Sequence, residues 1–360
     1  MNKMVHFKIA TILIIVFLAG IFSLNKNFSI AQNNNNQPRE IAQLLNNIEI
    51  DTAKSYKNMV IYPIKLTGKT GRSYHVLDEA IKNGIIEIKE KGSGDVNNLE
   101  INKNKSEKPA FLMSGEIVKG AKQDRVIARD IVLAKDSKKY VIPVYCVEQG
   151  RWDKQTERFD TAGIVASQSL RSTVVQKKSQ SKVWSEVTRK NQNLGASSGT
   201  SNYRASYESS KFKGEANSYI SHYIDLPDKN ITYIGVIVEI DGKISNMDLF
   251  SNHSNFSKLW PKLIKAYAQD AVDPSFSKTL PEIGSTSSLI KKLGYAEYKE
   301  DANPGAGNEY LIIASNITGN ALTYENETVH IATFITSSRS IDGEKDPQHQ
   351  QIPDLIRRRN

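Results

Sequence analysis

The chain has 360 residues, of which 39% are hydrophobic and 24% are charged. This composition predicts a folded body with a sizeable core and excludes a largely disordered chain. The formal net charge is +9, yet no arginine-rich run or stacked-aromatic motif accompanies it, so nucleic acid is not an expected partner. A mildly basic chain favours anionic ligands or surfaces.

The first segment, residues 1–31, has the layout of a secretory signal peptide. Lys3 and Lys8 precede an uncharged apolar run at residues 9–24, and small residues up to Ala31 provide a cleavage site. The run is shorter than the roughly 20 apolar residues that a bilayer span needs, which favours cleavage over an uncleaved membrane anchor. We therefore expect a periplasmic or extracellular protein, which contacts the membrane only if this segment is retained.

Residues 32–57 are expected to form a polar linker and a short helix, with the amphipathic pattern at residues 39–50. Residues 58–66 are strand-like, and Pro63 suggests an edge strand or a bulge. A short helix follows at residues 76–84 and ends at its glycine.

Three Val- and Ile-rich stretches, residues 109–118, 125–134 and 139–148, are predicted strands. The connections at residues 119–124 and 135–138 have the length and composition of hairpin turns. The expected product is an antiparallel sheet.

From residue 160 to residue 223 serine, lysine, glutamine and asparagine dominate. Residues 179–192 can form a helix around Trp184 and Val187, whereas residues 195–210 resemble a loose loop. This polar insertion is either a lid or a plain surface excursion.

Structure resumes at residues 231–250, where Asp241-Gly242 between two apolar runs is a strong hairpin signal. Helical periodicity follows at residues 255–272, and a shorter helix is predicted at residues 286–298. Residues 309–336 are expected to form two or three strands with a turn at Gly319-Asn320.

The elements together predict an α+β fold, with a β-rich antiparallel first half and helices mainly in the second half. A single domain is expected over residues 58–335, followed by a disordered tail at residues 336–360.

Two glycines raise the question of a phosphate-binding loop, because Gly115 and Gly120 have its spacing. That loop needs lysine directly after the second glycine, then a hydroxyl residue and a helix. Here Ala121 precedes Lys122, and Gln123 stands where the hydroxyl should be. The loop is therefore excluded, and a hairpin remains.

This hairpin presents Glu116, Lys122, Gln123 and Arg125. Gln123 and Arg125 are two positions apart on an extended strand, so they share one face. An arginine fork suits phosphate or carboxylate through paired hydrogen bonds. The alternative is a salt-bridged solvent face.

The stretch "CVEQGRW" is the second candidate. Cys146 and Glu148 share a strand face, so Glu148 is a candidate general base and Cys146 a candidate nucleophile. Arg151 can bind an anion or hold Glu148, and Trp152 is either a stacking platform or a core anchor. A buried structural thiol is the competing interpretation of Cys146.

His330 lies between Val329 and Ile331 on a predicted strand. It is a ligand-binding candidate only if that strand lies beside residues 146–152. No metal site is expected, since paired-cysteine and HExxH motifs do not occur. The sequence does not indicate a cofactor.

Six stretches resemble, in order, a bacterial domain family of unassigned activity named for its association with ADP-ribosylglycohydrolases and rhodanese/phosphatase-superfamily proteins. They are "NMVIYPI", "VLDEAIKNGIIEI", "KPAFLMSGEIVKGAKQDRVIARDIVL", "IPVYCVEQGRW", "IGVIVEIDGKISNMDLFSNHSNFSKLWPKLIKAYAQDA" and "NALTYENETVHIATF". The resemblance implies a part in handling ADP-ribose, NAD-derived or related phosphorylated metabolites. The family's motif residues fall here on Gly115, Glu116, Gly120, Lys122, Gln123, Arg125, Cys146, Glu148, Gly150, Arg151, Trp152 and His330.

Two functions are therefore open. The first is an exported protein that binds, or binds and processes, an anionic small molecule of phosphoribosyl type, with Glu116, Glu148 and Cys146 as catalytic candidates. Its ligand-binding candidates are Lys122, Gln123, Arg125, Arg151, Trp152 and His330. The second is a structural or interaction protein of the cell envelope without catalytic activity.

Overall fold

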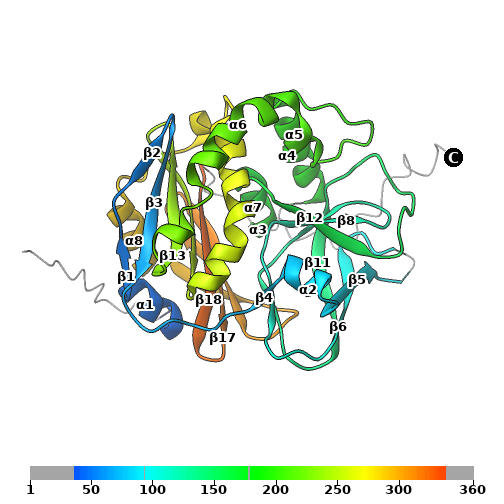
Figure 1. The fold of residues 1–360 in the computed structure, drawn as a ribbon, viewed down its shortest axis with the longest axis horizontal. Helices are drawn as coiled ribbons and strands as arrows, with labels where there is room; N and C mark the ends of the chain where they lie inside the picture. The colour runs from blue at the N-terminus through cyan, green and yellow to red at the C-terminus, as the bar shows by residue number, and fades with distance from the viewer. Residues whose placement is uncertain (1–35, 93, 177–178, 338–360) are drawn as a thin grey trace, which may run out of the picture.

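The computed structural model describes residues 36–92, 94–176 and 179–337. Two β-structures lie side by side with helices between them (Figure 1): a large open sheet on the left of the view and a closed barrel on the right. Residues 1–31, predicted to be a signal peptide, and nearly all of the predicted tail lie outside the described residues. No helix within the described ranges is long and apolar enough to cross a membrane.

The large sheet has nine strands and is antiparallel throughout. Its path runs β1-β3-β13-β14-β18-β17-β16-β15, and β2 also pairs with β3. The strands are β1 (Ile48–Ile50), β2 (Lys54–Tyr56), β3 (Met59–Leu66), β13 (Tyr233–Ile240), β14 (Lys243–Phe250), β15 (Glu297–Asp301), β16 (Asn308–Ala314), β17 (Ile317–Tyr324) and β18 (Glu327–Ile335).

The barrel closes through six strands in the order β11-β6-β5-β12-β8-β9. They are β5 (Ile86–Glu90), β6 (Asn98–Lys103), β8 (Glu116–Gly120), β9 (Arg125–Ile127), β11 (Lys138–Cys146) and β12 (Phe159–Val165). A three-stranded sheet adjoins it, with the order β10-β7-β4 and the strands β4 (His75–Val76), β7 (Ala110–Leu112) and β10 (Ile131–Leu133). Apolar side chains fill the barrel as a core of their own, separate from the main core of the large sheet and its helices.

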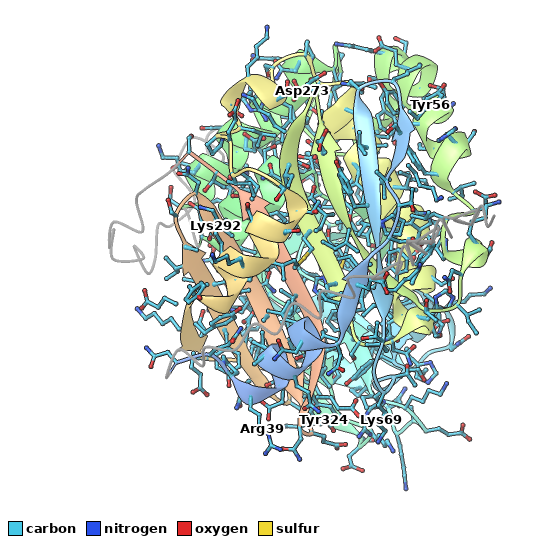
Figure 2. All side chains as sticks on the ribbon, turned by 90° about the vertical axis from the view of Figure 1, so that its left-hand side faces the viewer. Arg39, Tyr56, Lys69, Asp273, Lys292 and Tyr324 are labelled. Carbon is cyan, nitrogen blue, oxygen red and sulfur yellow. The ribbon has the colours of Figure 1, made fainter. Side chains whose placement is uncertain are left out.

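The helices cover both faces of the large sheet. On the outer face lie α1 (Arg39–Asn46) and α8 (Thr286–Gly294), which face the viewer in Figure 2. Between the sheet and the barrel lie α3 (Gln168–Val175) and α7 (His253–Ala271), which contacts both β13 and β12. The remaining helices are α2 (Leu77–Lys82), α4 (Gln180–Asn193), α5 (Ala205–Glu208) and α6 (Ser210–Tyr223), with short 3-10 turns at Pro227–Lys229 and Ser277–Thr279.

Local sequence explains several of these elements. In α1, Ile41, Leu44 and Leu45 recur at helical spacing and are buried on one face. The turn between β13 and β14 is Asp241-Gly242, and both residues have positive φ, 51° and 76°, as a two-residue type I′ hairpin requires. The predicted hairpin and the α+β class with its β-rich first half are confirmed.

Other predictions at the level of single elements are wrong. The predicted strand at residues 109–118 is interrupted at Met113 to Gly115 and forms two strands, β7 and β8, in different sheets. The connection at residues 135–138 is no hairpin, because β10 pairs with β7 while β11 pairs with β6 and β9.

Gly319-Asn320 is also no turn: both residues lie inside β17, where a Cβ on Gly319 would come within 2.2 Å of the Ala332 carbonyl oxygen. The glycine is there for close strand approach rather than for chain reversal. The reversal occurs at Glu325-Asn326, with φ values of 48° and 61°.

Two segments contain more secondary structure and more core residues than their composition suggests. Residues 32–57, expected to hold a linker and a helix, contain α1 and also β1 and β2. Residues 160–223 contain most of β12 and all of α3 to α6, and apolar side chains of this segment, including Leu170, Val183 and Val187, belong to the main core. Along one side of β3, β1 pairs with residues 64–66 and β2 with residues 59–61, and Pro63 lies in the gap between them. The missing N–H of the proline is tolerated there because no strand needs it as a donor.

Candidate functional site

The turn between β8 and β9 is closed by Asp124. Gly120 N donates to Asp124 Oδ1 at 3.1 Å, and Val147 N donates to the Asp124 carbonyl at 3.0 Å. Ala121 and Gly120 have positive φ, 42° and 119°. The hairpin therefore places its turn directly against the end of β11, where "CVEQGRW" begins.

Glu148 and Arg151 form a buried ion-pair cluster with Asp124, which we call the clamp. Arg151 Nε donates to Glu148 Oε2 at 2.8 Å, and Arg151 Nη2 lies 3.2 Å from Asp124 Oδ1. Glu148 Oε1 accepts from Thr200 Oγ1 at 2.7 Å, and Asp124 also pairs with Arg204. Every carboxylate oxygen of the clamp is occupied, so its geometry holds the barrel turn to the loop before α5.

The electrostatics of Glu148 agree with this role. Burial alone would raise its pKa, but Arg151 and Thr200 lower it below the ordinary value for a glutamate. An ionised carboxylate held by an arginine is a weak general base. Gly150 completes the contact, since its N–H donates to the Thr200 carbonyl at 2.8 Å and a Cβ would lie 2.9 Å from Thr200 Cα.

A second group of residues gathers at one end of the barrel, which we call the barrel mouth: the predicted Lys122, Gln123, Arg125, Cys146 and Trp152, together with Glu90, which was not predicted. Cys146 is the register partner of Arg125, and strand alternation directs both inward with Ile127 and Val144 of the barrel core. The Trp152 ring lies 5.9 Å from Arg125 Cζ and 4.8 Å from Lys122 Nζ.

The Arg125 guanidinium is incompletely satisfied although the residue is fully buried. Its Nη1 donates to Gln123 Oε1 at 3.1 Å. Its Nη2 lies 3.7 Å from Glu90 Oε1, too far for a hydrogen bond, and Nε also lacks a hydrogen-bond partner. Glu90 Oε2 is likewise buried without one.

Cys146 is a poor nucleophile in this position. Burial raises the pKa of its thiol to about 11, against a smaller lowering by Arg125. The thiol therefore stays protonated near neutral pH. Its backbone is tied to α4, since Gln180 accepts from Cys146 N and donates to its carbonyl, both at 2.8 Å.

Glu116 and His330 lie elsewhere. Glu116 accepts from Met113 N at 2.8 Å and pairs with Lys262 of α7, whose Nζ also lies 3.1 Å from Asp78 Oδ1. Lys262 has a raised pKa: burial would lower it, but the Glu116 carboxylate outweighs burial. Glu116 thus joins the barrel to the helix layer and does not face Gln123 and Arg125.

His330 is the centre of a buried charged chain between the two β-structures. Its Nδ1 lies 2.6 Å from Asp130 Oδ2 and its Nε2 lies 3.2 Å from Asp248 Oδ1. Arg171 of α3 grips Asp248 with two hydrogen bonds of 2.9 and 2.7 Å. The imidazole also stacks on Phe250, with ring centroids 4.4 Å apart.

The chain of charges is balanced by its own members. Burial would lower the pKa of His330, but Asp130 and Asp248 raise it above the ordinary value, so both nitrogens donate. Burial would raise the pKa of Asp248, but Arg171 and His330 bring it far below the ordinary value. Two cations and two carboxylates give a net charge of zero.

The predicted site residues therefore separate into three places. Lys122, Gln123, Arg125, Cys146 and Trp152 meet at the barrel mouth, and the clamp of Glu148 and Arg151 adjoins it through the 121–124 turn. Glu116 and His330 bind partners in the helix layer and the large sheet instead. The hydrogen-bond partners of His330 come from β14 and the β9–β10 connection, not from residues 146–152.

Sequence reasoning missed the partners that organise these charges: Asp124, Asp130, Arg171, Asp248, and the buried group of Lys190 with Asp270 and Asp273. A signal for one of them was present. Asn246 and Asp248 alternate with Met247 and Leu249, so they form a polar strand face inside an otherwise apolar run. Asp130 similarly interrupts two apolar strands. Within the described ranges, no three metal-ligating side chains gather as a metal site.

The fold and these charges define a class of α+β protein in which a closed six-stranded barrel is fastened to a nine-stranded antiparallel sheet through helices and buried ion pairs. The chain belongs to the ARPP-1 family, described as the ARG and Rhodanese-Phosphatase-superfamily-associated Protein domain, whose model matches residues 47–334. The matched range runs from just before β1 into β18 and includes both the sheet and the barrel. No curated protein and no solved structure matches the chain.

Proposed function

We propose that this protein is exported and binds an anionic small molecule of phosphoribosyl type at the barrel mouth. The N-terminal sequence supports export, because its two lysines and apolar run have the order of a signal peptide. The observation that carries the binding proposal is the Arg125 guanidinium, with Nε and Nη2 buried and without hydrogen-bond partners.

An oxyanion suits this guanidinium. A buried polar group without a partner costs about 1–3 kcal/mol, and more when it is charged. Two phosphate oxygens can accept from Nε and Nη2 together, which is the paired geometry that arginine favours. Lys122 adds a second positive charge beside the same ring, and Trp152 offers a flat apolar surface for a sugar or a base.

Access to Arg125 sets a condition on this binding. Arg125 is fully buried, whereas Trp152 and Lys122 are partly exposed, and the residues from Asp153 to Arg158 that follow the tryptophan are exposed. The ligand reaches the guanidinium when Trp152 moves aside. Lys122 and the clamp keep the rest of the mouth in place, so Glu148 and Arg151 act as supports rather than as acid and base.

The test is a binding measurement on the full-length chain in mild detergent. Ribose 5-phosphate and ADP-ribose are compared with ribose and with inorganic phosphate by calorimetry. Arg125→Gln is expected to weaken binding at least tenfold, because the loss of one charged partner costs about 2–5 kcal/mol. Arg158→Gln is the matched control, since Arg158 pairs with Glu87 on the barrel surface. Equal affinity in Arg125→Gln and wild type refutes the site.

A second candidate function, a structural or interaction protein of the envelope, is favoured by the completeness of the clamp. Every Glu148 and Asp124 oxygen already has a protein partner. If this function is the right one, Arg125→Gln and Glu148→Gln both lower the melting temperature, and none of the four compounds raises it. A ligand that binds only the folded state raises the melting temperature by mass action, so one thermal-shift series separates the two candidates.

A further inference from the structure

A shallow pocket lies on the outer face of the large sheet, far along the chain from the barrel mouth. It has a volume of about 360 Å³ and is lined by Ser288, Lys291, Lys292, Tyr295, Ala314 and Ser315. These residues come from α8 and the tyrosine that follows it, and from the end of β16 and the turn to β17. Figure 2 shows Lys292 on this face, toward the viewer.

The lining has a cationic and an apolar part. Neither Lys291 nor Lys292 forms an ion pair with any residue that the structure describes. Tyr295 is half exposed and contributes an aromatic surface, and Ala314 adds an aliphatic wall. An occupant with one apolar side chain beside carboxylates matches this surface.

The chain itself leaves the fold at this pocket. Thr336 N donates to the Asn316 carbonyl at 3.1 Å, and Asn316 directly follows the lining residue Ser315. Residues 338–360 continue from there. An extended chain advances about 3.3 Å per residue, so the four steps from Ser337 to Ile341 can span up to roughly 13 Å, enough to cross a pocket of this size.

We propose that the segment from Ile341 to Asp346, "IDGEKD", binds this pocket. Ile341 packs against Tyr295 and Ala314, and the carboxylates of the segment face the two lysines. The segment holds three acids and one lysine, a net charge of −2, which complements the pocket. The "RRR" run near residue 358 carries the same sign as Lys291 and Lys292 and is excluded as the occupant.

The length of chain outside the structure, its point of exit and its charge all favour this segment over a separate partner. The same segment of a second copy of the chain could reach the pocket only by association of two molecules. It would have to compete with the attached segment, whose local concentration at the pocket is higher. For short flexible tethers that concentration is in the millimolar range.

Disulfide trapping tests the proposal on the full-length chain in mild detergent. Ser340→Cys is combined with Ser288→Cys, and Cys146 does not compete because it is buried with a raised pKa. The control pair joins Ser288→Cys with Asn360→Cys at the far end of the same tail. The first pair has the shorter tether and closes faster than the control for that reason alone, so docking is read from how the rate of the first pair responds to charge reversal.

Charge reversal separates docking from random encounter. Lys291→Glu with Lys292→Glu should slow closure of the first pair at least several-fold and leave the control pair nearly unchanged, and adding Asp342→Lys with Glu344→Lys should restore the rate of the first pair. Because the two lysines lie at the surface, the folded state is checked simply by an unchanged melting temperature. Equal rates for both pairs, indifference to charge reversal, or disulfide-linked dimers in place of internal bonds overturn the proposal.

Discussion

The charge balance around His330 makes a quantitative prediction for Arg171→Met. Methionine keeps much of the volume of the arginine stem but removes the guanidinium that holds Asp248 through bonds of 2.9 and 2.7 Å. The buried group then contains one cation, His330, and two carboxylates, Asp130 and Asp248. Its net charge falls from zero to −1 with all members fully buried or nearly so.

Breaking a buried pair by removing one partner costs about 3–5 kcal/mol, because the other charge stays in a medium of low polarity. At roughly 2 °C per kcal/mol for a chain longer than 150 residues, Arg171→Met should lower the melting temperature by about 6–10 °C. Asp248→Asn leaves a charge of +1 and should cost a similar amount.

The double variant Arg171→Met with Asp248→Asn returns the group to zero net charge, because His330 and Asp130 remain. It should therefore be clearly less destabilised than the sum of the two single variants, with a coupling of about 1–3 kcal/mol. Urea denaturation of the four proteins measures this cycle, and Arg158→Met on the barrel surface controls for loss of any arginine. Additive effects would show that charge balance does not hold this layer together.

Three further predictions concern pH, reactivity and packing. Burial raises the pKa of Glu309 to about 8 from an ordinary value of 4.5, so folding binds a proton and stability falls as the pH rises from about 4.5 to 8. Stability from the His330 cation is complete below 6.5 and is lost as the pH rises through its raised pKa, in the same direction. Melting temperatures from pH 5 to 9 should fall in the wild type and fall less in Glu309→Gln, and equal slopes contradict the assignment to Glu309. Cys146 should react with iodoacetamide at pH 8 only in denaturant, and rapid labelling of the folded chain would show an open thiol. Gly150→Ala should cost about 1–3 kcal/mol by overpacking against Thr200, as read from urea midpoints, whereas Gly199→Ala, with open space around it, should change little.

The fold was predictable where the deciding interactions are local. Asp241-Gly242 encodes its own hairpin because both residues readily take positive φ. The prediction of a turn at Gly319 is wrong because the role of this glycine depends on β18, which the local sequence does not identify. The glycine lets Ala332 and Thr333 approach closely. The Gly-Asn dipeptide is common in turns, but here it does not form one. Likewise, the local sequence around residues 135–138 does not indicate that β11 pairs with β6 and β9 and not with β10.

The candidate site divides in the same way. Arg125 and Cys146 were each placed correctly on strands, and the structure makes them register partners. Because β9 and β11 are neighbours, the segments that adjoin them bring Lys122 and Trp152 close to Arg125. Glu116 and His330 instead bind charged partners on α7 and β14, which lie more than eighty positions away in the sequence in each case. A single sequence carries no information on which distant charge will balance a buried one.

The barrel has a consequence for the order of folding. All six of its strands lie within residues 86–165, so it can close from contacts that are near in sequence. The large sheet cannot, because Lys65 of β3 pairs with Tyr233 of β13, 168 positions later. Contacts between distant positions form slowly, since the intervening loop must close first. Until β13 arrives, β3 exposes an unpaired apolar edge of the kind that promotes aggregation. A chain that emerges from its N-terminus thus completes the barrel first and then waits, with this edge open, for its C-terminal half.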